Sequence, residues 1–194
     1  MARFQTIPNG VDTWSTLDDR VWDHPGAIID LGCNPWNWSE PFIGRKRVIG
    51  VDPLADPRKG TECFQGVIGP VCGSARLLQT EGAGEASTMV GSSSSVIGEK
   101  VINIPMLSWR DFCRTYQIGQ IAALKINIEG SEYGLIHSMG TLDFDQIDQL
   151  VVSFHHWMIP GMEKATEAAL YYLRSVGYQI EPIFPACAWY LCLR

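Results

Sequence analysis

The sequence predicts an α/β fold built on a doubly wound, mostly parallel sheet. Two short apolar runs, Ala27–Leu31 and Arg47–Val51, are each closed by an acidic residue and a turn. Such runs are typical of parallel strands that are buried on both faces. Between them lie a glycine-containing loop and a stretch long enough for a short helix. Together these features predict a strand–loop–helix–strand unit that opens the sheet.

Length and composition describe one ordinary globular domain. The chain has 194 residues, of which 46% are hydrophobic and 19% are charged, and we treat residues 1–194 as a single domain with a substantial core. The formal net charge of −6 argues against a nucleic-acid-binding surface, which would be basic. Five basic residues form the densest positive stretches, which we interpret as a solvated loop face: Arg45, Lys46, Arg47, Arg58 and Lys59.

Membrane and secretion signals are not found in the sequence. No run of about 18 apolar residues occurs, so we expect no transmembrane helix and no membrane partner. The N-terminal region lacks a continuous apolar segment, so we expect no signal peptide. The six cysteines include no Cys-x-x-Cys pair, and Cys33, Cys72 and Cys113 fall in or beside apolar runs, as reduced cysteines do. The expected location is cytoplasmic.

The N-terminal segment is predicted to be helical. Apolar residues spaced three and four apart predict a helix over Val11–Trp22, which Pro25–Gly26 ends. We expect residues 1–26 to form a helical cap that covers part of the ligand cleft.

The middle of the chain is predicted to contain two strands and a loop. Gly66–Val71 predicts the third strand, and Val101–Ile104 predicts another that Pro105 breaks. Residues 74–98 are rich in Gly and Ser and predict a mobile loop region, which begins with a short extended segment over Ala75–Gln79.

The second half alternates strands and helices. Ser108, three residues before Asp111, indicates the start of a helix. The elements after it are a strand over Ile121–Ile128, a helix from the Glu129–Ser131 turn to about Gly140, a strand over Asp148–Phe154, a helix over Met162–Val176 and an antiparallel hairpin of Tyr178–Ile183 with Ala188–Leu193.

Acidic residues at the ends of the first two strands indicate a ligand site. In a doubly wound sheet, ligands bind beyond the carboxyl ends of the strands, where Asp30, Gly32 and Asp52 are expected. A glycine there lets the backbone approach a ligand closely, and the Asp52 carboxylate can accept both hydroxyls of a ribose. The alternative is that Asp52 only caps a strand end.

The most informative stretch is Lys125–Glu132, Lys-Ile-Asn-Ile-Glu-Gly-Ser-Glu. On a strand, the side chains of Lys125, Asn127 and Glu129 would share one face, and three polar groups are costly to bury without partners. A ligand cleft at the end of the strand would relieve that cost. Alternatively, Lys125 pairs internally with a carboxylate such as Glu129 or Asp30.

Three segments together resemble the FkbM-type S-adenosylmethionine-dependent methyltransferases. Ile29–Asn34 matches the D-x-G-x-N-x-G loop of that family, Val51–Pro53 supplies its acidic residue after the second strand, and Leu124–Glu132 matches its K-I-D-V-E-G-A-E block. The likeness spans about residues 27–157. It implies a Rossmann-like class I methyltransferase sandwich with a mostly parallel seven-stranded sheet and an antiparallel C-terminal hairpin.

The resemblance also implies S-adenosylmethionine as cofactor and O-methylation of a small-molecule or sugar-like acceptor. Glu129 and His155 are candidates for the general base, and Lys125 would orient the acceptor or the carboxylate. No metal is implied by the residues. The cofactor-binding residues implied are Asp30, Gly32 and Asn34 at the methionine and ribose, Asp52 at the ribose hydroxyls, Pro53, Val71 and Cys72 near the adenine, and Asn127 near the methyl-transfer region.

The chain departs from the family pattern at two positions, which leaves other functions open. Trp36 stands where the family has its second Gly, beside Pro35, and Asn127 stands where it has an Asp. These changes motivate a second hypothesis, a non-catalytic binding or interaction protein on the same fold. A nicotinamide-dependent oxidoreductase is a third hypothesis, although no full Gly-x-Gly-x-x-Gly fingerprint follows Gly32.

Overall fold

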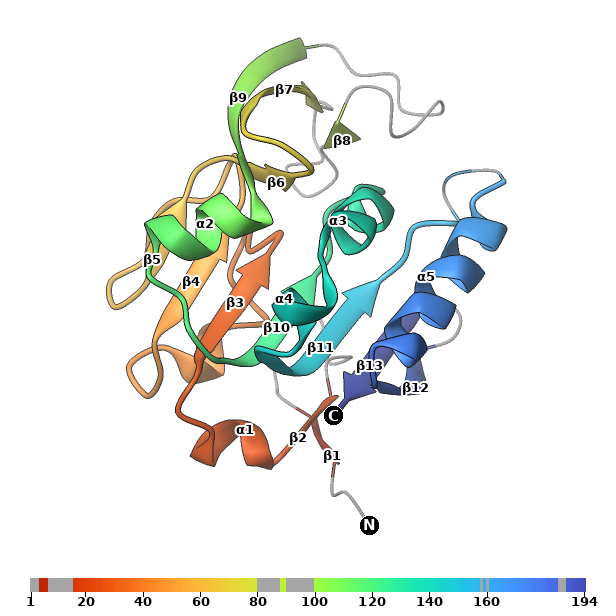
Figure 1. The fold of residues 1–194 in the computed structure, drawn as a ribbon. Coiled ribbons are helices and arrows are strands. Elements are labelled where there is room, and N and C mark those ends of the chain that lie inside the picture. The colour runs from red at the N-terminus through yellow and green to blue at the C-terminus, as the bar shows by residue number, and fades with distance from the viewer. Residues whose placement is uncertain are drawn as a thin grey trace.

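The structure, a computed structural model, describes residues 4–6, 16–79, 88–89, 100–157, 159, 161–184 and 188–194. Its described residues form a central seven-stranded sheet in the order β12-β13-β11-β10-β3-β4-β5 (Figure 1). The five strands from β11 to β5 are parallel, whereas β13 runs antiparallel to β11 and β12. The predicted α/β fold with its C-terminal hairpin is therefore confirmed. The strands are β3 (Ala27–Leu31), β4 (Val48–Val51), β5 (Glu62–Phe64), β10 (Ile121–Ile126), β11 (Ile147–Ser153), β12 (Gln179–Phe184) and β13 (Trp189–Leu193).

The sheet is covered on both faces, which explains its continuous apolar strands. Every residue of β3, β4 and β10 is buried. One face packs against α2 (Trp109–Thr115), α3 (Glu132–Ser138), α4 (Thr141–Phe144) and α5 (Glu163–Ser175), with which it shares a single core. The other face packs against residues between Leu17 and Phe42, including Trp36 and Trp38.

A second sheet stands above the carboxyl ends of β3 and β4 in Figure 1. Its order is β6-β9-β7-β8, and its strands are β6 (Val67–Gly69), β7 (Gly73–Gln79), β8 (Thr88–Met89) and β9 (Lys100–Ser108). The predicted strands Gly66–Val71 and Val101–Ile104 thus belong to this sheet. The edge of the main sheet is formed by β5, which the sequence did not reveal because it has three residues and Glu62 at its start is exposed.

Pro105 does not end its strand as predicted, because β9 continues to Ser108. The parallel pairing of β9 with β6 begins only at Met106, whereas its antiparallel pairing with β7 includes Pro105. One edge of β9 is therefore without a strand neighbour at Pro105 among the described residues, and a residue without an N–H is tolerated there.

The helix predicted over Val11–Trp22 is wrong at Thr16–Asp18 and correct only at its C-terminal end, from Arg20. Thr16–Asp18 form β2, which pairs antiparallel with β1 (Phe4–Thr6), and the helix α1 covers only Arg20–Asp23. The side chain of Gln149 explains the extended conformation. Its Oε1 accepts a hydrogen bond from the backbone N–H of Asp18 at 2.9 Å, and its Nε2 donates to the carbonyl of Asp18 at 3.0 Å.

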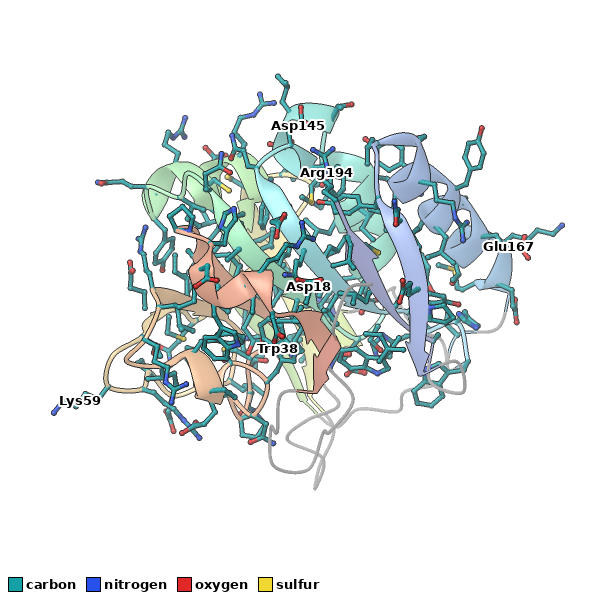
Figure 2. All side chains as sticks on the ribbon, turned by 90° about the horizontal axis from the view of Figure 1, so that it is seen from below. Asp18, Trp38, Lys59, Asp145, Glu167 and Arg194 are labelled. Atoms are coloured by element: carbon teal, nitrogen blue, oxygen red, sulfur yellow. The ribbon has the colours of Figure 1, made fainter. Side chains whose placement is uncertain are left out.

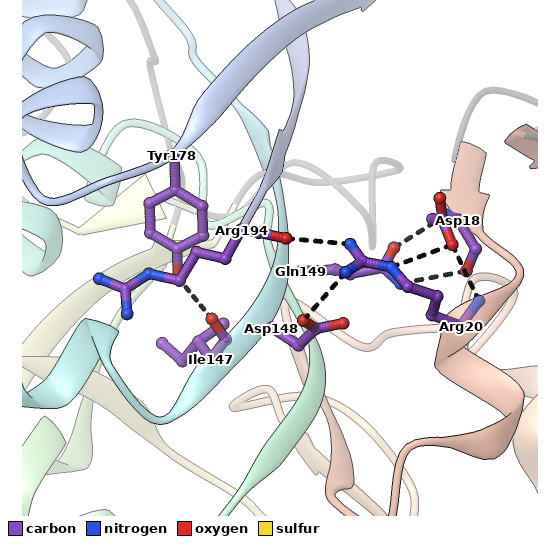
Figure 3. A network of polar contacts seen from close by, with 7 residues as sticks. All are labelled: Asp18, Arg20, Ile147, Asp148, Gln149, Tyr178 and Arg194. Atoms are coloured by element: carbon purple, nitrogen blue, oxygen red, sulfur yellow. Dashed lines mark hydrogen bonds and ion pairs between the residues drawn. The ribbon is translucent and has the colours of Figure 1, made fainter. Parts of the chain in front are cut away.

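Arg20 extends this N-terminal connection to the end of the chain (Figure 3). Its guanidinium contacts the carboxylates of Asp18 and Asp148 and donates to the carbonyl of Arg194. The extended segment predicted over Ala75–Gln79 is confirmed as part of strand β7, and most of the mobile loop predicted after it, residues 80–87 and 90–98, lies outside the described residues.

Most of the other predicted elements are confirmed with shifts at their ends. The Ser108 side chain accepts a hydrogen bond from the N–H of Asp111 at 3.1 Å and caps α2 as expected. The short α4 was not predicted, and the helix expected between β3 and β4 is a 3₁₀ turn over Glu40–Phe42.

Two of the five basic residues near β4 form ion pairs. Arg47 pairs with Glu62 and Arg58 pairs with Glu40, while Figure 2 shows Lys59 extending away from the ribbon. This arrangement agrees with the interpretation of these residues as a solvated face.

Candidate functional site

A pocket lies at the carboxyl ends of β3, β4 and β10, between them and the second sheet. This is the edge at which a doubly wound sheet binds its ligands. Six predicted site residues line the pocket: Gly32, Asn34, Asp52, Pro53, Asn127 and Glu129. Its other lining residues are Leu31, Val51, Leu54, Gly66, Val67, Ile68, Leu77, Ile128 and Ser131.

Gly32 lines the pocket and also has a structural role that the sequence did not predict. Its φ is +79°, in the left-handed region, and a Cβ at this position would lie 1.9 Å from the carbonyl oxygen of Asn127. The glycine is thus required because the loop after β3 and the segment after β10 touch through their backbones. The N–H of Asn127 also donates to the carbonyl of Leu31 at 3.1 Å, which holds these two segments together.

Asp52 presents a carboxylate beside the end of β4. Its Oδ1 accepts a hydrogen bond from the N–H of Leu54 at 2.7 Å, which orients the side chain. Burial raises the pKa of Asp52 above its ordinary value, although hydrogen bonds from the backbone of Leu54 and Asn34 act in the opposite direction. A ligand that offers hydroxyl donors would therefore meet a partly desolvated acceptor.

Asp30 and Lys125 do not line the pocket, contrary to the prediction. They are neighbours in register on β3 and β10, and their side chains meet in a buried ion pair with Nζ and Oδ1 2.9 Å apart. Lys125 also donates to the carbonyl of Gly32 at 2.7 Å, and Ser39 donates to the other Asp30 oxygen at 2.7 Å. The alternative of an internal pair was correct, and Lys125 positions the Gly32 loop.

The expected common face of Lys125, Asn127 and Glu129 is not formed. The strand β10 ends at Ile126, and Glu129 has a φ of +52°, in the left-handed region. Lys125 therefore points to the face of Asp30, while Asn127 and Glu129 reach the pocket. A positive φ is uncommon at a non-glycine residue, and here it turns the chain after β10 so that the Glu129 side chain reaches the pocket.

His155 bridges two carboxylates behind the pocket. Its Nδ1 lies 2.9 Å from Oε1 of Glu132, and its Nε2 lies 3.4 Å from Oε2 of Glu129. Glu132 is fully buried and also accepts hydrogen bonds from the N–H groups of Ile128 and Gly130. Glu132 was not predicted as a site residue, although it ends the block that carried the prediction.

The surroundings of His155 favour a protonated imidazole over the general base that was considered for it. Burial alone would lower the pKa of this imidazole, but the hydrogen bonds and negative charges of Glu129 and Glu132 outweigh burial and raise the pKa to about 10. His155 is therefore protonated at neutral pH and holds Glu129 toward the pocket. Glu129 remains the candidate base.

We expect the free energy of unfolding to fall as pH rises from 7 to 10. The pKa of His155 is about 10 in the folded chain and 6.5 in the unfolded chain, so its contribution is complete below pH 6.5 and is lost through pH 10. The loss amounts to at most about 1.4 kcal/mol per pH unit. Urea unfolding of the wild type and of His155→Gln at several pH values measures it. The difference in unfolding free energy between wild type and His155→Gln should shrink as pH rises. The control His137→Gln, at an exposed position, should show the same pH dependence as the wild type.

Trp36 does not fill the pocket. It has a φ of +75°, so it adopts the left-handed conformation for which glycine is suited. Its indole is 2% exposed, lies over Gly50 and donates from Nε1 to the carbonyl of Asp56 at 2.9 Å. The tryptophan that replaces the glycine of the D-x-G-x-N-x-G loop therefore packs against Gly50 of β4 and not into the pocket.

Val71 and Cys72 are not among the residues that line the pocket. Val71 is 59% exposed. The thiol of Cys72 contacts a carboxylate oxygen of Asp111 at 2.8 Å, at the start of α2. A role of these two residues near an adenine therefore has no support from their placement.

The described residues contain no group of three or more His, Cys, Asp and Glu side chains placed to hold a metal ion. None of the helices that the structure describes combines the length and the apolar character needed to cross a membrane.

The chain is similar to known methyltransferases, both in a family model and in a solved structure. Residues 42–180 match the family described as methyltransferase FkbM domain. Among solved structures, the chain is similar to methyltransferase FkbM from Methylobacillus flagellatus KT, with 13% identity and a TM-score of 0.47. The similarity covers 87% of this chain and 43% of that one, so the chain spans less than half the length of that protein. The comparison with curated proteins found no match.

Proposed function

Because the chain belongs to the methyltransferase FkbM domain family, we propose that it transfers a methyl group from S-adenosylmethionine to a hydroxyl oxygen of a small-molecule or sugar-like acceptor. One observation carries this proposal: a single pocket at the strand ends brings together Asp52 and Glu129. The first is suited to hold a ribose, and the second is suited to accept a proton.

The polarity and charge of the lining residues support this cofactor. Apolar side chains of Leu54, Val67, Ile68 and Leu77 offer a surface for a flat base. Asp52 and Glu129 are the charged side chains among the described lining residues, and both are acidic, which suits the positive sulfonium. The Oγ of Ser131 has no hydrogen-bond partner within the described part of the chain, so a polar ligand group would satisfy it once the side chain turned.

The cofactor would supply an already activated methyl group, and the chain would supply binding, orientation and proton acceptance. Asp52 would hold the ribose hydroxyls beside Pro53. Glu129 would accept the proton of the acceptor hydroxyl. His155, protonated and fixed by Glu132, would keep the Glu129 carboxylate directed at the acceptor.

Titration calorimetry tests the cofactor directly. We expect micromolar binding of S-adenosylmethionine and S-adenosylhomocysteine and no binding of NAD. Asp52→Ala should weaken S-adenosylhomocysteine binding by about 1.5–3 kcal/mol, the range for hydrogen bonds to a charged group. Asp56→Asn is the control, because Asp56 is exposed and contributes its backbone carbonyl to Trp36. Equal affinities in wild type and Asp52→Ala would contradict the ribose contact.

Three further expectations accompany this proposal. A cytoplasmic location and a single domain over residues 1–194 remain predictions from the sequence. A nucleic-acid partner is disfavoured by the net charge of −6 and by the ion pairs of Arg47 and Arg58.

A further inference from the structure

Two cysteines meet on the face of the sheet opposite the helices. Gly50 on β4 lacks a side chain, and the Sγ of Cys33 takes that space, 2.6 Å from where a Cβ would stand. Gly50 is also the register partner of Cys63 on the neighbouring parallel strand β5. Register partners on adjacent strands direct their side chains to the same face, about 4.8 Å apart. The Cys33 sulfur therefore lies beside Cys63, close enough for each thiol to shift the pKa of the other.

We propose that Cys33 and Cys63 form an oxidation site at which hydrogen peroxide closes a disulfide, and that this disulfide alters the neighbouring pocket. Both cysteines are free in the structure. Cys33 is buried, whereas Cys63 is partly exposed on the edge strand of the sheet, so a small oxidant reaches Cys63 first.

The surroundings of the two thiols assign them different steps. The hydrogen bond from Cys33 lowers the pKa of Cys63, while the same hydrogen bond, burial and the charges of Asp30 and Asp52 raise the pKa of Cys33. The Cys63 thiolate is thus the attacking group and Cys33 is the resolving thiol.

The reaction balances with peroxide as the only oxidant. The Cys63 sulfur attacks one peroxide oxygen, the O–O bond breaks, and the departing hydroxide takes up a proton to give water and a sulfenic acid. The Cys33 sulfur then attacks the sulfenic sulfur, and its proton leaves with the displaced hydroxide as a second water. Two thiols and one peroxide give one disulfide and two waters.

The other described cysteines lack these features. Burial raises the pKa of Cys113 to about 12 and also raises that of Cys192. Cys72 is free and exposed, and its thiol contacts Ser108 and Asp111. Cys72 is therefore a matched control for simple exposure.

The position of Cys33 connects the disulfide to the pocket. Its chain neighbours Gly32 and Asn34 both line the pocket. A sulfur–sulfur bond of about 2.05 Å is much shorter than a hydrogen bond between thiols, so its closure draws Cys33 toward β5. We expect the loop to follow and S-adenosylhomocysteine to bind at least threefold more weakly. This second part of the inference rests on the proposed function.

The test treats the purified chain with hydrogen peroxide and then blocks the remaining thiols. Peptide mapping by mass spectrometry should find Cys33 linked to Cys63 in the wild type and in Cys72→Ser, and no such link in Cys63→Ser. Calorimetry with S-adenosylhomocysteine should show the weaker binding after oxidation and its recovery after reduction with dithiothreitol. The affinity of Cys63→Ser should not respond to peroxide.

The outcomes separate the two parts of the inference. A wild-type map without the Cys33–Cys63 link overturns the oxidation site. A linked protein with unchanged affinity overturns its effect on the pocket. If the reduced protein does not bind S-adenosylhomocysteine at all, the proposed function and the effect on the pocket fail, while the map still decides whether the pair is oxidised.

Discussion

Replacing Glu129 by Gln should lower the turnover number of methyl transfer by about 10²- to 10⁴-fold, the usual contribution of a general base. Gln keeps the size of the side chain and loses the proton acceptor. Because Asp52 and not Glu129 is proposed to hold the ribose, the affinity for S-adenosylhomocysteine should remain nearly intact. A screen of hydroxylated acceptors with the wild type identifies the substrate with which turnover is then measured.

Glu163→Gln is the control for this variant, because Glu163 is an exposed acid at the start of α5 and remote in sequence from the pocket residues. It should retain wild-type turnover. Unchanged turnover in Glu129→Gln would remove Glu129 from the mechanism. A large loss of cofactor affinity in that variant would instead make Glu129 a binding residue.

Replacing Lys125 by Met should lower the free energy of unfolding by about 3–5 kcal/mol, as expected when one partner of a buried ion pair is removed. Asp30 is 0% exposed, so its carboxylate would keep only the hydrogen bond from Ser39. The carbonyl of Gly32 would lose its donor as well. Urea unfolding followed by circular dichroism measures the change.

Two matched variants separate this loss from a simple change of charge. Arg47→Met removes one partner of an exposed pair with Glu62 and should cost about 1 kcal/mol or less. In Lys125→Met combined with Asp30→Leu, part of the lost stability should return, because no buried charge is left alone. If Lys125→Met lowered the free energy of unfolding by less than Arg47→Met does, the buried pair would not stabilise the fold.

The parallel strands and the last helix were predictable from the sequence for a physical reason. Burial on both faces requires continuous apolar runs, as in β3 and β10, and one buried face requires the helical spacing seen in α5. The second sheet was not predictable as a separate unit, because its strands β6 and β9 resemble short strands of the main sheet. Their local sequence carries no information about which strands they pair with.

The sequence predicted which residues line the pocket better than it predicted what each of them does. Six predicted residues line the pocket because the order of strands in the sheet brings their loops together. The role of Lys125 depended on which carboxylate stands beside it, and the register of β10 with β3 decides that. The charge of His155 depends on Glu129 and Glu132 at its two nitrogens, a contact that only the folded chain creates.

The backbone contact between Gly32 and Asn127 has a consequence for the thermodynamics of binding. The loop after β3 and the segment after β10 are joined by this contact, by the hydrogen bond of Asn127 to Leu31 and by Lys125. These two segments are therefore already ordered before a ligand binds, so little of the binding free energy is spent on ordering them. On the opposite side of the pocket, β6 and β7 of the second sheet contribute Val67, Ile68 and Leu77, the apolar surface proposed for the flat base of the cofactor.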